Sequence, residues 1–254
     1  MPLSRAKGVE LREGVVSRPV SPWSASTQAL LGHLNRQGFR GAPQPLGLQR
    51  SEHVTYIDGS AEPNQPSDPY SSFALGRFLR EFHRAAASFR FVDLPWQSNP
   101  LRGIQGHQRI CGHGDIAPWN VIWRAGHPVG LVDWELAGPI ARDVDLAYAA
   151  WTCTRLFDDA TCQHEGLAPA HERIGLLRSF LDGYEFPRQR RAQFVSRMID
   201  VAVVSAANDS HEAGIAPSGV HGRVELLWGV AWRLGSARWL IEQRASITSK
   251  LCRT

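Results

Sequence analysis

The segment HGDIAPWNVIW, His113–Trp123, places several polar residues directly before an apolar run. Asp115 and Asn120 stand five positions apart, and NVIW is followed by the turn-like RAGHP and a second apolar run, VGLVDW, which contains Asp133. Two apolar runs joined by a turn with Gly and Pro are typical of a β-hairpin. The pattern predicts that Asn120, at the start of one strand, lies roughly opposite Asp133, at the end of the other.

This hairpin would bring together the side chains needed for metal-assisted chemistry. Facing side chains on antiparallel strands lie about 4.5–5.5 Å apart, so two oxygen ligands can share one cation. An amide oxygen and a carboxylate suit Mg²⁺, which fills its shell with water and substrate phosphates. Asp115, one short loop upstream, could orient a substrate hydroxyl and accept its proton. The alternative is that Asp115 and Asn120 only cap a loop.

The elements that must position these residues begin with a small lobe rich in strands. GVELR and VVSRPV alternate polar and apolar residues around Glu13–Gly14, which predicts a hairpin. A helix is expected in SPWSASTQALLGHLNRQGF, where Gly38 marks its end, and HVTYIDG predicts a strand over His53–Gly59. The N-terminal lobe is therefore placed at residues 1–59, with a hinge near 55–59.

A larger, mainly helical lobe is predicted for residues 60–254. It begins with SAEPNQPSDP, a connector rich in Pro, Ser, Asn and Asp, and SSFALGRFLREFH follows with apolar residues at helical spacing. Trp228, Trp232 and Trp239 recur on one helical face, which favours core packing over a ligand wall. The residues that bind an acceptor are expected from the helical region after position 150.

The motifs HGDIAPWN and LVDWE resemble the catalytic loop and the metal-binding strand of the aminoglycoside phosphotransferase and choline kinase family, relatives of protein kinases. RDVDLAYAAW is similar to the acidic segment and helix that follow them there, and weaker similarity covers most of the chain. The resemblance implies an α+β, bilobal, protein-kinase-like fold that binds ATP or GTP between its lobes. It also implies transfer of the γ-phosphoryl group to a hydroxyl of a small molecule.

The resemblance assigns roles by position within these motifs. It implies that Asp115 is the catalytic base and that Asn120 and Asp133 are Mg²⁺ ligands. His113 would be a structural member of the catalytic loop that ties it to the following segment. Asp145 would support the loop from the start of its helix, although an acid that satisfies the helix dipole is an equally good interpretation.

The nucleotide side of the predicted site departs from the usual pattern. Kinase-like enzymes hold the phosphates with a strand lysine that is paired with a helix glutamate. Here the strand offers Arg18, which can grip phosphate or be an ordinary surface arginine, and the helix offers Gln28. No glycine-rich phosphate loop is recognisable, which leaves open whether the first strand is truncated. The connector residues expected to contact adenine, mainly through backbone groups, are Thr55, Tyr56, Ile57 and Asp58.

Composition narrows the classes of function. The 254 residues are 43% hydrophobic, but no apolar run approaches the roughly 20 residues of a membrane helix. The N-terminus has no hydrophobic signal-peptide core, so a cytoplasmic protein without a membrane partner is expected. The four cysteines form no CxxC pair, which disfavours disulfides and zinc. Nearly all the positive charge behind the net charge of +4 is arginine. The basic segment Pro187–Phe194 makes no long stripe interleaved with aromatic residues, so no nucleic-acid partner is expected, and its cluster at 188–191 is interpreted as a solvated helix face.

The competing hypothesis is a degenerate kinase-like protein that binds a nucleotide or a metabolite without turnover. The missing strand lysine, helix glutamate and glycine-rich loop favour it. The complete set of Asp115, Asn120 and Asp133 favours catalysis, because a protein that only binds needs no such set. The sequence leaves open the acceptor, the choice between ATP and GTP, the oligomeric state, and whether antibiotic resistance or metabolism is served.

Overall fold

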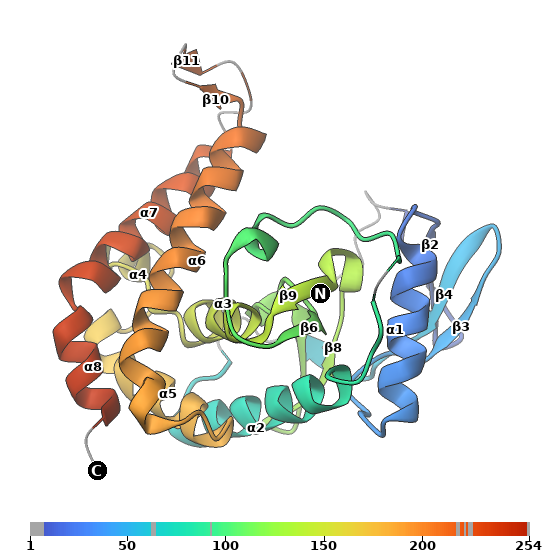
Figure 1. The fold of residues 1–254 in the computed structure, drawn as a ribbon, viewed down its shortest axis with the longest axis horizontal. Coiled ribbons are helices and arrows are strands. Elements are labelled where there is room, and N and C mark those ends of the chain that lie inside the picture. The colour runs from blue at the N-terminus through green and yellow to red at the C-terminus, as the bar shows by residue number, and fades with distance from the viewer. Residues whose placement is uncertain are drawn as a thin grey trace.

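The computed structural model describes residues 8–61, 65–91, 93–216, 219–220, 222 and 226–252. Three predicted features fall partly outside these ranges. They are the N-terminal segment without a glycine-rich loop (1–7), part of the predicted connector (62–64) and the start of the last predicted helical run (223–225). Figure 1 shows a strand-rich N-terminal part beside a group of helices, from which α6 and α7 project together.

A four-stranded antiparallel sheet and one helix form the N-terminal part, with strands in the order β1-β2-β4-β3. Its elements are β1 (Glu10–Arg12), β2 (Val15–Pro19), α1 (Ser24–Arg36), β3 (Pro45–Leu48) and β4 (Ser51–Thr55). The structure contains the hairpin predicted at Glu13–Gly14. Both turn residues have positive φ, which matches the twist of the strands that they join.

The strand β3 was not predicted, and the strand expected within His53–Gly59, ending in a turn, begins two residues earlier, at Ser51. β4 ends at Thr55, and β3 pairs with it at the edge of the sheet. Pro45 and Gly47 obscure β3 in the sequence, because proline cannot donate a ladder hydrogen bond and glycine weakens a strand. Both are tolerated here because an edge strand leaves one side unpaired.

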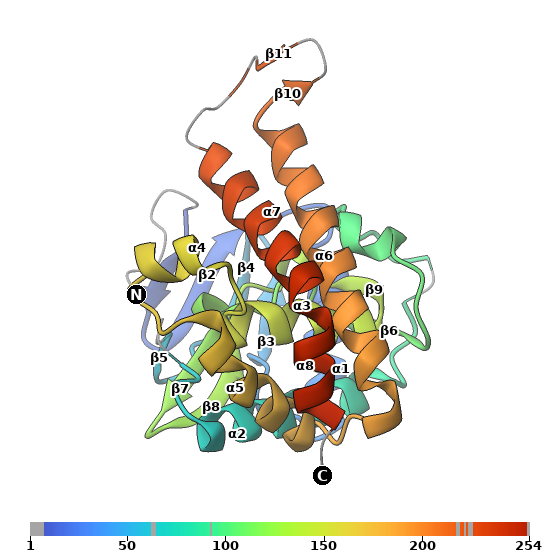
Figure 2. The same ribbon diagram turned by 90° about the vertical axis from the view of Figure 1, so that its left-hand side faces the viewer.

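Short strands and long helices make up the rest of the described chain. One antiparallel sheet joins β5 (Ser60–Ala61), β7 (Val121–Arg124) and β8 (His127–Leu131); another joins β6 (Arg109–Gly112) and β9 (Gly138–Ala141). The helices are α2 (Pro69–Ala86), α3 (Arg142–Thr154), α4 (Asp159–His164), α5 (Ala170–Gly183), α6 (Arg191–Glu212), α7 (Leu227–Glu242) and α8 (Arg244–Cys252). β10 (Ile215–Ala216) and β11 (Gly219–Val220) pair at the tip of the α6–α7 projection (Figure 2).

One continuous hydrophobic core runs through both parts of the chain. It includes Leu31 of α1, Phe82 of α2, Trp123 of β7 and Phe180 of α5, all 1% exposed or less. The predicted boundary near residue 59 lies where the chain leaves the first sheet and enters the second. Because the two parts share this core, the boundary stays a prediction about lobes of one body.

The basic cluster Pro187–Phe194 is more buried than expected. Arg191 is only 2% exposed, and its guanidinium contacts Asp182 at 2.5 Å and the carbonyl oxygens of Phe186 and Leu251. The expectation of a solvated face is therefore wrong at this position. Within the described part of the chain, no helix has the length and apolar character needed to cross a membrane.

Helices α2 and α5 pack with their backbones in close approach. A Cβ atom at Gly76 of α2 would overlap the carbonyl oxygen of Phe180, and one at Gly183 of α5 would overlap that of Phe73. Backbone atoms cannot move aside as the end of a flexible side chain can. The two glycines therefore fix the distance at which α2 meets α5.

Gly76→Ala should lower the free energy of unfolding by about 1–3 kcal/mol, because overpacking forces the helices apart. Gly175→Ala is the matched control, since Gly175 lies within α5 and faces open space. That change should be neutral or stabilise by about 0.5–1 kcal/mol, because alanine favours a helix. Urea unfolding measures both, and equal effects would contradict the close approach.

Candidate active site

The loop that contains Asp115 follows β6 directly and is shaped by a glycine. β6 pairs with β9, which leads into α3, so the loop begins beside the first turn of that helix. Gly114 has a φ of 79°, and a Cβ atom there would overlap the carbonyl oxygen of Leu136. Glycine therefore permits the turn that brings Asp115 under the hairpin.

Asp145, in the first turn of α3, anchors this loop. Its carboxylate is fully buried and accepts hydrogen bonds from the backbone N–H groups of His113 at 3.1 Å and Gly114 at 2.8 Å. The Nε2 atom of His83 lies 3.1 Å from the same carboxylate. Burial alone would raise the pKa of Asp145, but the hydrogen bonds from His83 and from the N–H of Gly114 outweigh it and lower the pKa.

A chain of hydrogen-bonded side chains, from Arg142 through Tyr184 to His83, supports Asp145. The Nε atom of Arg142 donates to the Tyr184 hydroxyl at 3.0 Å, and that hydroxyl lies 2.7 Å from Nδ1 of His83. Burial raises the pKa of Tyr184 to about 12, so its hydroxyl keeps its proton to donate to His83. His83 can then donate from Nε2 to Asp145, which connects helices α2, α3 and α5 to the loop.

His113 ties the loop to the hairpin, as the resemblance implied. Its Nε2 atom lies 3.0 Å from the carbonyl oxygen of Val132 and donates to it, while Nδ1 accepts from the N–H of Asp115 at 3.3 Å. The ring is fully buried and packs on Trp134, with centroids 4.6 Å apart. Both ring nitrogens are thus used within the protein, which makes His113 a positioning residue for Asp115.

The carboxylate of Asp115 is held on both oxygens. Oδ2 accepts from the side-chain amide of Asn120 at 2.9 Å, and Oδ1 accepts from the hydroxyl of Tyr148 at 2.8 Å. The Asn120 amide also donates to the Asp115 carbonyl oxygen at 2.8 Å. Burial raises the pKa of Asp115, and the bond from Tyr148 opposes this shift. These bonds fix the direction of the carboxylate and leave each oxygen a further lone pair.

The structure contains the predicted hairpin, with a register one residue from the expected one. Val121 pairs with Leu131, and the N–H of Val132 donates to the carbonyl oxygen of Asn120 at 3.0 Å. Asn120 therefore lies opposite Val132, and Asp133 comes one residue later. Asp133 has a φ of 61° and a ψ of 62°, a left-handed conformation that few residues other than glycine adopt. The chain turns there into the Trp134–Leu136 turn.

The oxygen atoms of Asn120 and Asp133 fit a hard divalent cation such as Mg²⁺. The Asn120 nitrogen donates to Asp115, so its Oδ1 is the atom left to serve as a ligand. The Asp133 side chain is exposed and forms no hydrogen bond or ion pair with any described residue. No described cluster of three or more His, Cys, Asp or Glu could bind a metal. A cation here would take its remaining ligands from water and phosphate.

Arg18 on β2 is paired with a glutamate that the sequence did not predict. Arg18 and Glu52 face each other across the β2–β4 ladder, with Nε–Oε2 and Nη2–Oε1 distances of 2.9 and 2.8 Å. Gln28 and Ser24 of α1 also donate to Glu52, which is 2% exposed. Burial would lower the pKa of Arg18, but Glu52 raises it. The fully charged guanidinium lies within electrostatic range of Asp133.

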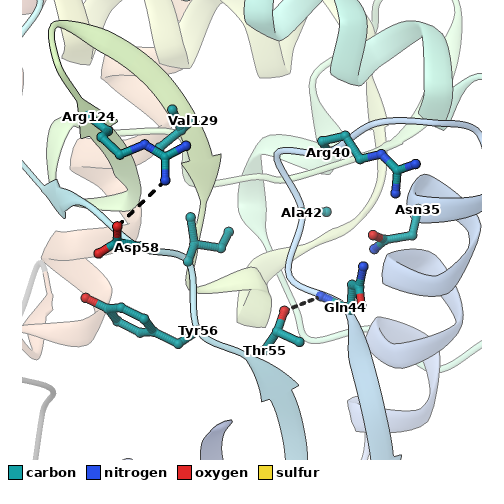
Figure 3. Close-up of a pocket in the computed structure, with 10 residues that line it drawn as sticks. Asn35, Arg40, Ala42, Gln44, Thr55, Tyr56, Asp58, Arg124 and Val129 are labelled. Atoms are coloured by element: carbon teal, nitrogen blue, oxygen red, sulfur yellow. Dashed lines mark hydrogen bonds and ion pairs between the residues drawn. The ribbon is translucent and has the colours of Figure 1, made fainter. Parts of the chain in front are cut away.

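The connector residues line a cavity to which Asp115 and Asp133 do not contribute. The N–H groups of Thr55 and Tyr56 already donate to the carbonyl oxygens of Gln44 and Gly14, so they are not available to adenine. The cavity beside the connector has a volume of about 370 Å³ (Figure 3). The residues that line it are Asn35, Arg40, Ala42, Gln44, Thr55, Tyr56, Ile57, Asp58, Arg124 and Val129. Neither Arg18 nor Asp115, Asn120 or Asp133 is among them.

An aromatic group lies beside Tyr148 where α3 meets α7. Trp151 stacks on Trp232, with ring centroids 5.0 Å apart and an interplanar angle of 28°. Arg233 lies 4.4 Å from the centroid of Trp232 and pairs with Asp209 of α6 at 2.6 Å. Burial is the main cause of the raised pKa of Tyr148. The charge of Arg233 lowers this pKa, and the charge of Asp209 raises it. This group is therefore close to the hydroxyl that contacts Asp115.

The predicted tryptophan stripe on α7 is only partly core. Trp239 is buried and Trp232 is half-buried, but Trp228 is 46% exposed. Trp228 lies nearest the projecting tip, where its ring contacts His164 of α4. The expectation of core packing is confirmed for Trp239 and wrong for Trp228.

The chain is 36% identical over 248 residues to the trifolitoxin immunity protein of Rhizobium leguminosarum bv. trifolii. That alignment covers 96% of this chain and 94% of the relative. Residues 94–191, which include the loop and the hairpin, match the phosphotransferase enzyme family. The chain belongs to that family.

Solved structures show the same fold at low identity. A choline/ethanolamine kinase family protein from Mesorhizobium loti matches with a TM-score of 0.61 and 13% identity, over 96% of this chain and 88% of that one. Amicoumacin kinase, in complex with AMP-PNP and Ca²⁺, matches with a TM-score of 0.62 and 10% identity, over 93% of this chain and 82% of that one. The predicted kinase-like fold is thereby confirmed.

Sequence reasoning missed three residues of this site: His83, Tyr148 and Glu52. Tyr148 stands three positions after Asp145 and thus on the same side of α3, a signal that could have found it. His83 is polar among the apolar positions of α2, which marks a buried polar group in need of a partner. Glu52 interrupts the apolar alternation of β4, but nothing local to it indicates Arg18.

Asp145→Asn should lower the free energy of unfolding at pH 7 by about 3 kcal/mol, because it removes the charge that three buried donors require. The folded-state pKa of Asp145 is lowered, so its stabilising effect is complete above the unfolded-state pKa of about 4. It is lost as the pH falls below that value. Urea unfolding of both proteins at several pH values should show the difference shrinking in acid. A difference independent of pH would contradict a charged Asp145.

Proposed function

We propose that this chain transfers the γ-phosphoryl group of ATP or GTP to a hydroxyl of a small molecule. The proposal rests mainly on one observation: Asp115 is held by Asn120 and Tyr148, next to an exposed Asp133 that has no partner among the described residues. A loop cap would not need a buried tyrosine to orient its acid. Membership of the phosphotransferase enzyme family is consistent with this assignment.

Asp115 is the proton acceptor in this reaction. The acceptor hydroxyl would donate its hydrogen bond to a carboxylate oxygen of Asp115, and the proton would pass to that oxygen as the hydroxyl attacks the γ-phosphorus. A new O–P bond forms, the bond from the γ-phosphorus to its bridging oxygen breaks, and a nucleoside diphosphate leaves. The protein mainly positions the reactants, which is how phosphoryl transfer is usually catalysed.

Asn120, Asp133 and Arg18 would neutralise the phosphates. Asn120 and Asp133 would hold Mg²⁺, which would supply positive charge to offset the charge that develops on the phosphates. Arg18, kept in place by Glu52, would contact the same phosphates from the N-terminal part of the chain. With the N–H groups of Thr55 and Tyr56 already donated, recognition of adenine by N–H donors at the connector would fall to Ile57 and Asp58.

The acceptor is proposed to be a toxin, or a molecule chemically related to one. The 36% identical relative is named for immunity to trifolitoxin, and a phosphate placed on a hydroxyl would change the charge and shape of a toxin. The half-buried ring of Trp232, with the pair of Arg233 and Asp209, would contact the acceptor near Asp115, and the buried Trp151 would support that ring from the core. This ring and these charges suit an acceptor with flat apolar and polar parts.

A binding protein without turnover is the second candidate. It is favoured by the Arg18–Glu52 pair, because two of the guanidinium nitrogens of Arg18 are already committed to the carboxylate. Such a protein would sequester a toxin or bind a nucleotide. It would consume no nucleotide with any acceptor, which separates it from an enzyme.

Asp115→Asn should lower kcat about a thousandfold, because general-base catalysis contributes roughly 10²–10⁴. Nucleotide consumption would first be screened against hydroxylated small molecules and toxins, with and without Mg²⁺, to find an acceptor. Nucleotide affinity and the melting temperature should stay close to those of the unmodified protein. Asp159→Asn, at the start of α4, is the matched control and should keep full activity. A fully active Asp115→Asn variant would reject the proposed base.

Tyr148→Phe should lower kcat about tenfold or more, because a hydrogen bond to a charged group is worth about 1.5–3 kcal/mol. The KM for nucleotide should not change, since Tyr148 orients Asp115 and lies away from Arg18. Tyr184→Phe removes another buried hydroxyl, whose partners are His83 and Arg142. It should reduce stability more than kcat. If both variants lowered kcat equally, Tyr148 would have no special role at Asp115.

A further inference from the structure

The cavity beside the connector is separate from Arg18, the residue proposed to hold the phosphates. In the sheet order β1-β2-β4-β3, Arg18 lies on β2, on one side of β4, and the cavity lies on the other side, toward β3. Its lining comes from α1, the α1–β3 segment, the connector and the β7–β8 hairpin, with no residue from β1 or β2. A ligand in this cavity would therefore not occupy the position of the phosphates that Arg18 is proposed to hold.

The cavity has a size and a polarity suited to a small ligand. Its volume of about 370 Å³ falls within the range of roughly 300–1,000 Å³ typical of small-molecule sites. Ala42, Ile57 and Val129 supply apolar surface, and polar side chains supply the rest. Asp58 is the only acid in the lining, and it lies at the solvent-exposed edge, 81% exposed.

Two arginines approach the cavity from opposite sides (Figure 3). Arg40, on the segment after α1, forms no hydrogen bond or ion pair with any described residue. Arg124, at the end of β7, reaches Asp58 at 3.7 Å, and both side chains are more than half exposed. Such an exposed pair contributes little stability, so Arg124 can turn to another anion at low cost. Guanidinium groups bind carboxylates and phosphates through paired hydrogen bonds.

Neutral donors complete the lining between the two arginines. The Thr55 hydroxyl accepts from the N–H of Gln44 at 2.8 Å, which leaves its own proton to donate. The side-chain amide of Gln44 has no partner among the described residues. Asn35 adds no donor, because its amide nitrogen already donates to the carbonyl oxygens of Leu31 and Pro43. The donors of the lining are therefore the two arginines, Thr55 and Gln44, and a ligand rich in acceptor oxygens would satisfy them.

We propose that this cavity is a second ligand site, which binds a small oxyanion, a carboxylate or a phosphate ester, between Arg40 and Arg124. The ligand also joins segments that position the proposed metal ligands. The N–H of Leu131 on β8 donates to the carbonyl oxygen of Gly41 at 2.8 Å, and β7 and β8 lead to Asn120 and Asp133 at their ends. Occupancy therefore stiffens the hairpin and lowers hydrogen exchange across residues 121–131.

Calorimetric titration tests the site with two probes, inorganic phosphate and malonate, at constant ionic strength set with chloride. At least one probe binds with a saturable one-to-one isotherm. The probe that binds more tightly shows whether phosphate or carboxylate is the favoured group. Arg40→Gln and Arg124→Gln each raise the Kd about tenfold or more, since each removes a charged donor. No saturable binding of either probe to the unmodified protein overturns the proposal.

Two further variants distinguish binding in this cavity from binding elsewhere on the protein. Arg238→Gln, an exposed arginine of α7 that lies 3.7 Å from Glu242, leaves the Kd unchanged and controls for general charge. The double variant Arg18→Gln/Glu52→Gln removes the cleft arginine without leaving a buried charge unpaired, and it also keeps the Kd. If the double variant weakens binding while Arg40→Gln does not, the anion occupies the cleft and the proposal is wrong. This result is independent of whether phosphoryl transfer is observed.

Hydrogen exchange gives a second readout that needs no activity. With the tighter-binding probe at a concentration equal to its Kd for the unmodified protein, residues 55–58 and 121–131 of that protein exchange more slowly, and Arg40→Gln removes most of this protection. Melting temperatures check that each variant is folded; because Arg40 and Arg124 are exposed, neither change should unfold the protein. Undiminished protection in Arg40→Gln at this concentration overturns the assignment of the ligand to this cavity.

Discussion

The buried carboxylate of Asp145 is the constraint on which the site depends. A charge without solvent must be surrounded by donors, and here the donors are two consecutive N–H groups of the loop and the ring of His83. The helix that carries Asp145 therefore cannot shift without moving His113 and Gly114. Because Tyr148 stands one turn further along the same helix, the loop anchor and the hydroxyl that orients Asp115 belong to one rigid element. The same helix therefore sets both the position of Asp115 and the direction of its carboxylate.

The hairpin meets this loop through His113 as well as through Asn120, which donates to Asp115 directly. The Nε2 atom of His113 bonds the carbonyl oxygen of Val132, one residue before Asp133, while Nδ1 accepts from the Asp115 backbone. One imidazole thereby sets the relation between the proposed base and a proposed metal ligand. The left-handed conformation of Asp133 is unusual for aspartate, and strain of this kind persists where the surroundings enforce it. The chain accepts it at a position whose carboxylate is exposed and is a proposed metal ligand.

What the sequence could predict depended on how local each interaction is. Asp115, Asn120 and Asp133 are linked by one loop and one hairpin, so the periodicity of a few residues located them, with an error of one residue in register. Glu52 could not be assigned, because its partner Arg18 is 34 positions away and only the sheet order joins them. His83 and Asp145 are 62 positions apart. β3 was hidden for another reason, since Pro45 and Gly47 break the strand pattern that its edge position tolerates.

The pairing of Arg18 with Glu52 differs from the ion pair that positions the phosphate-binding residue of protein kinases. In protein kinases the phosphate-binding lysine is paired with a glutamate on a helix, and movement of that helix can break the pair. Here the carboxylate stands on the adjacent strand, in direct register with the arginine, and the helix contributes only Gln28 and Ser24 as donors to it. The register of a sheet ladder cannot shift by a fraction of a residue. A movement of α1 would therefore leave the Arg18–Glu52 pair formed. The N-terminal part therefore presents a fixed cation, and in the proposed reaction control would come from the loop, the hairpin or the acceptor side.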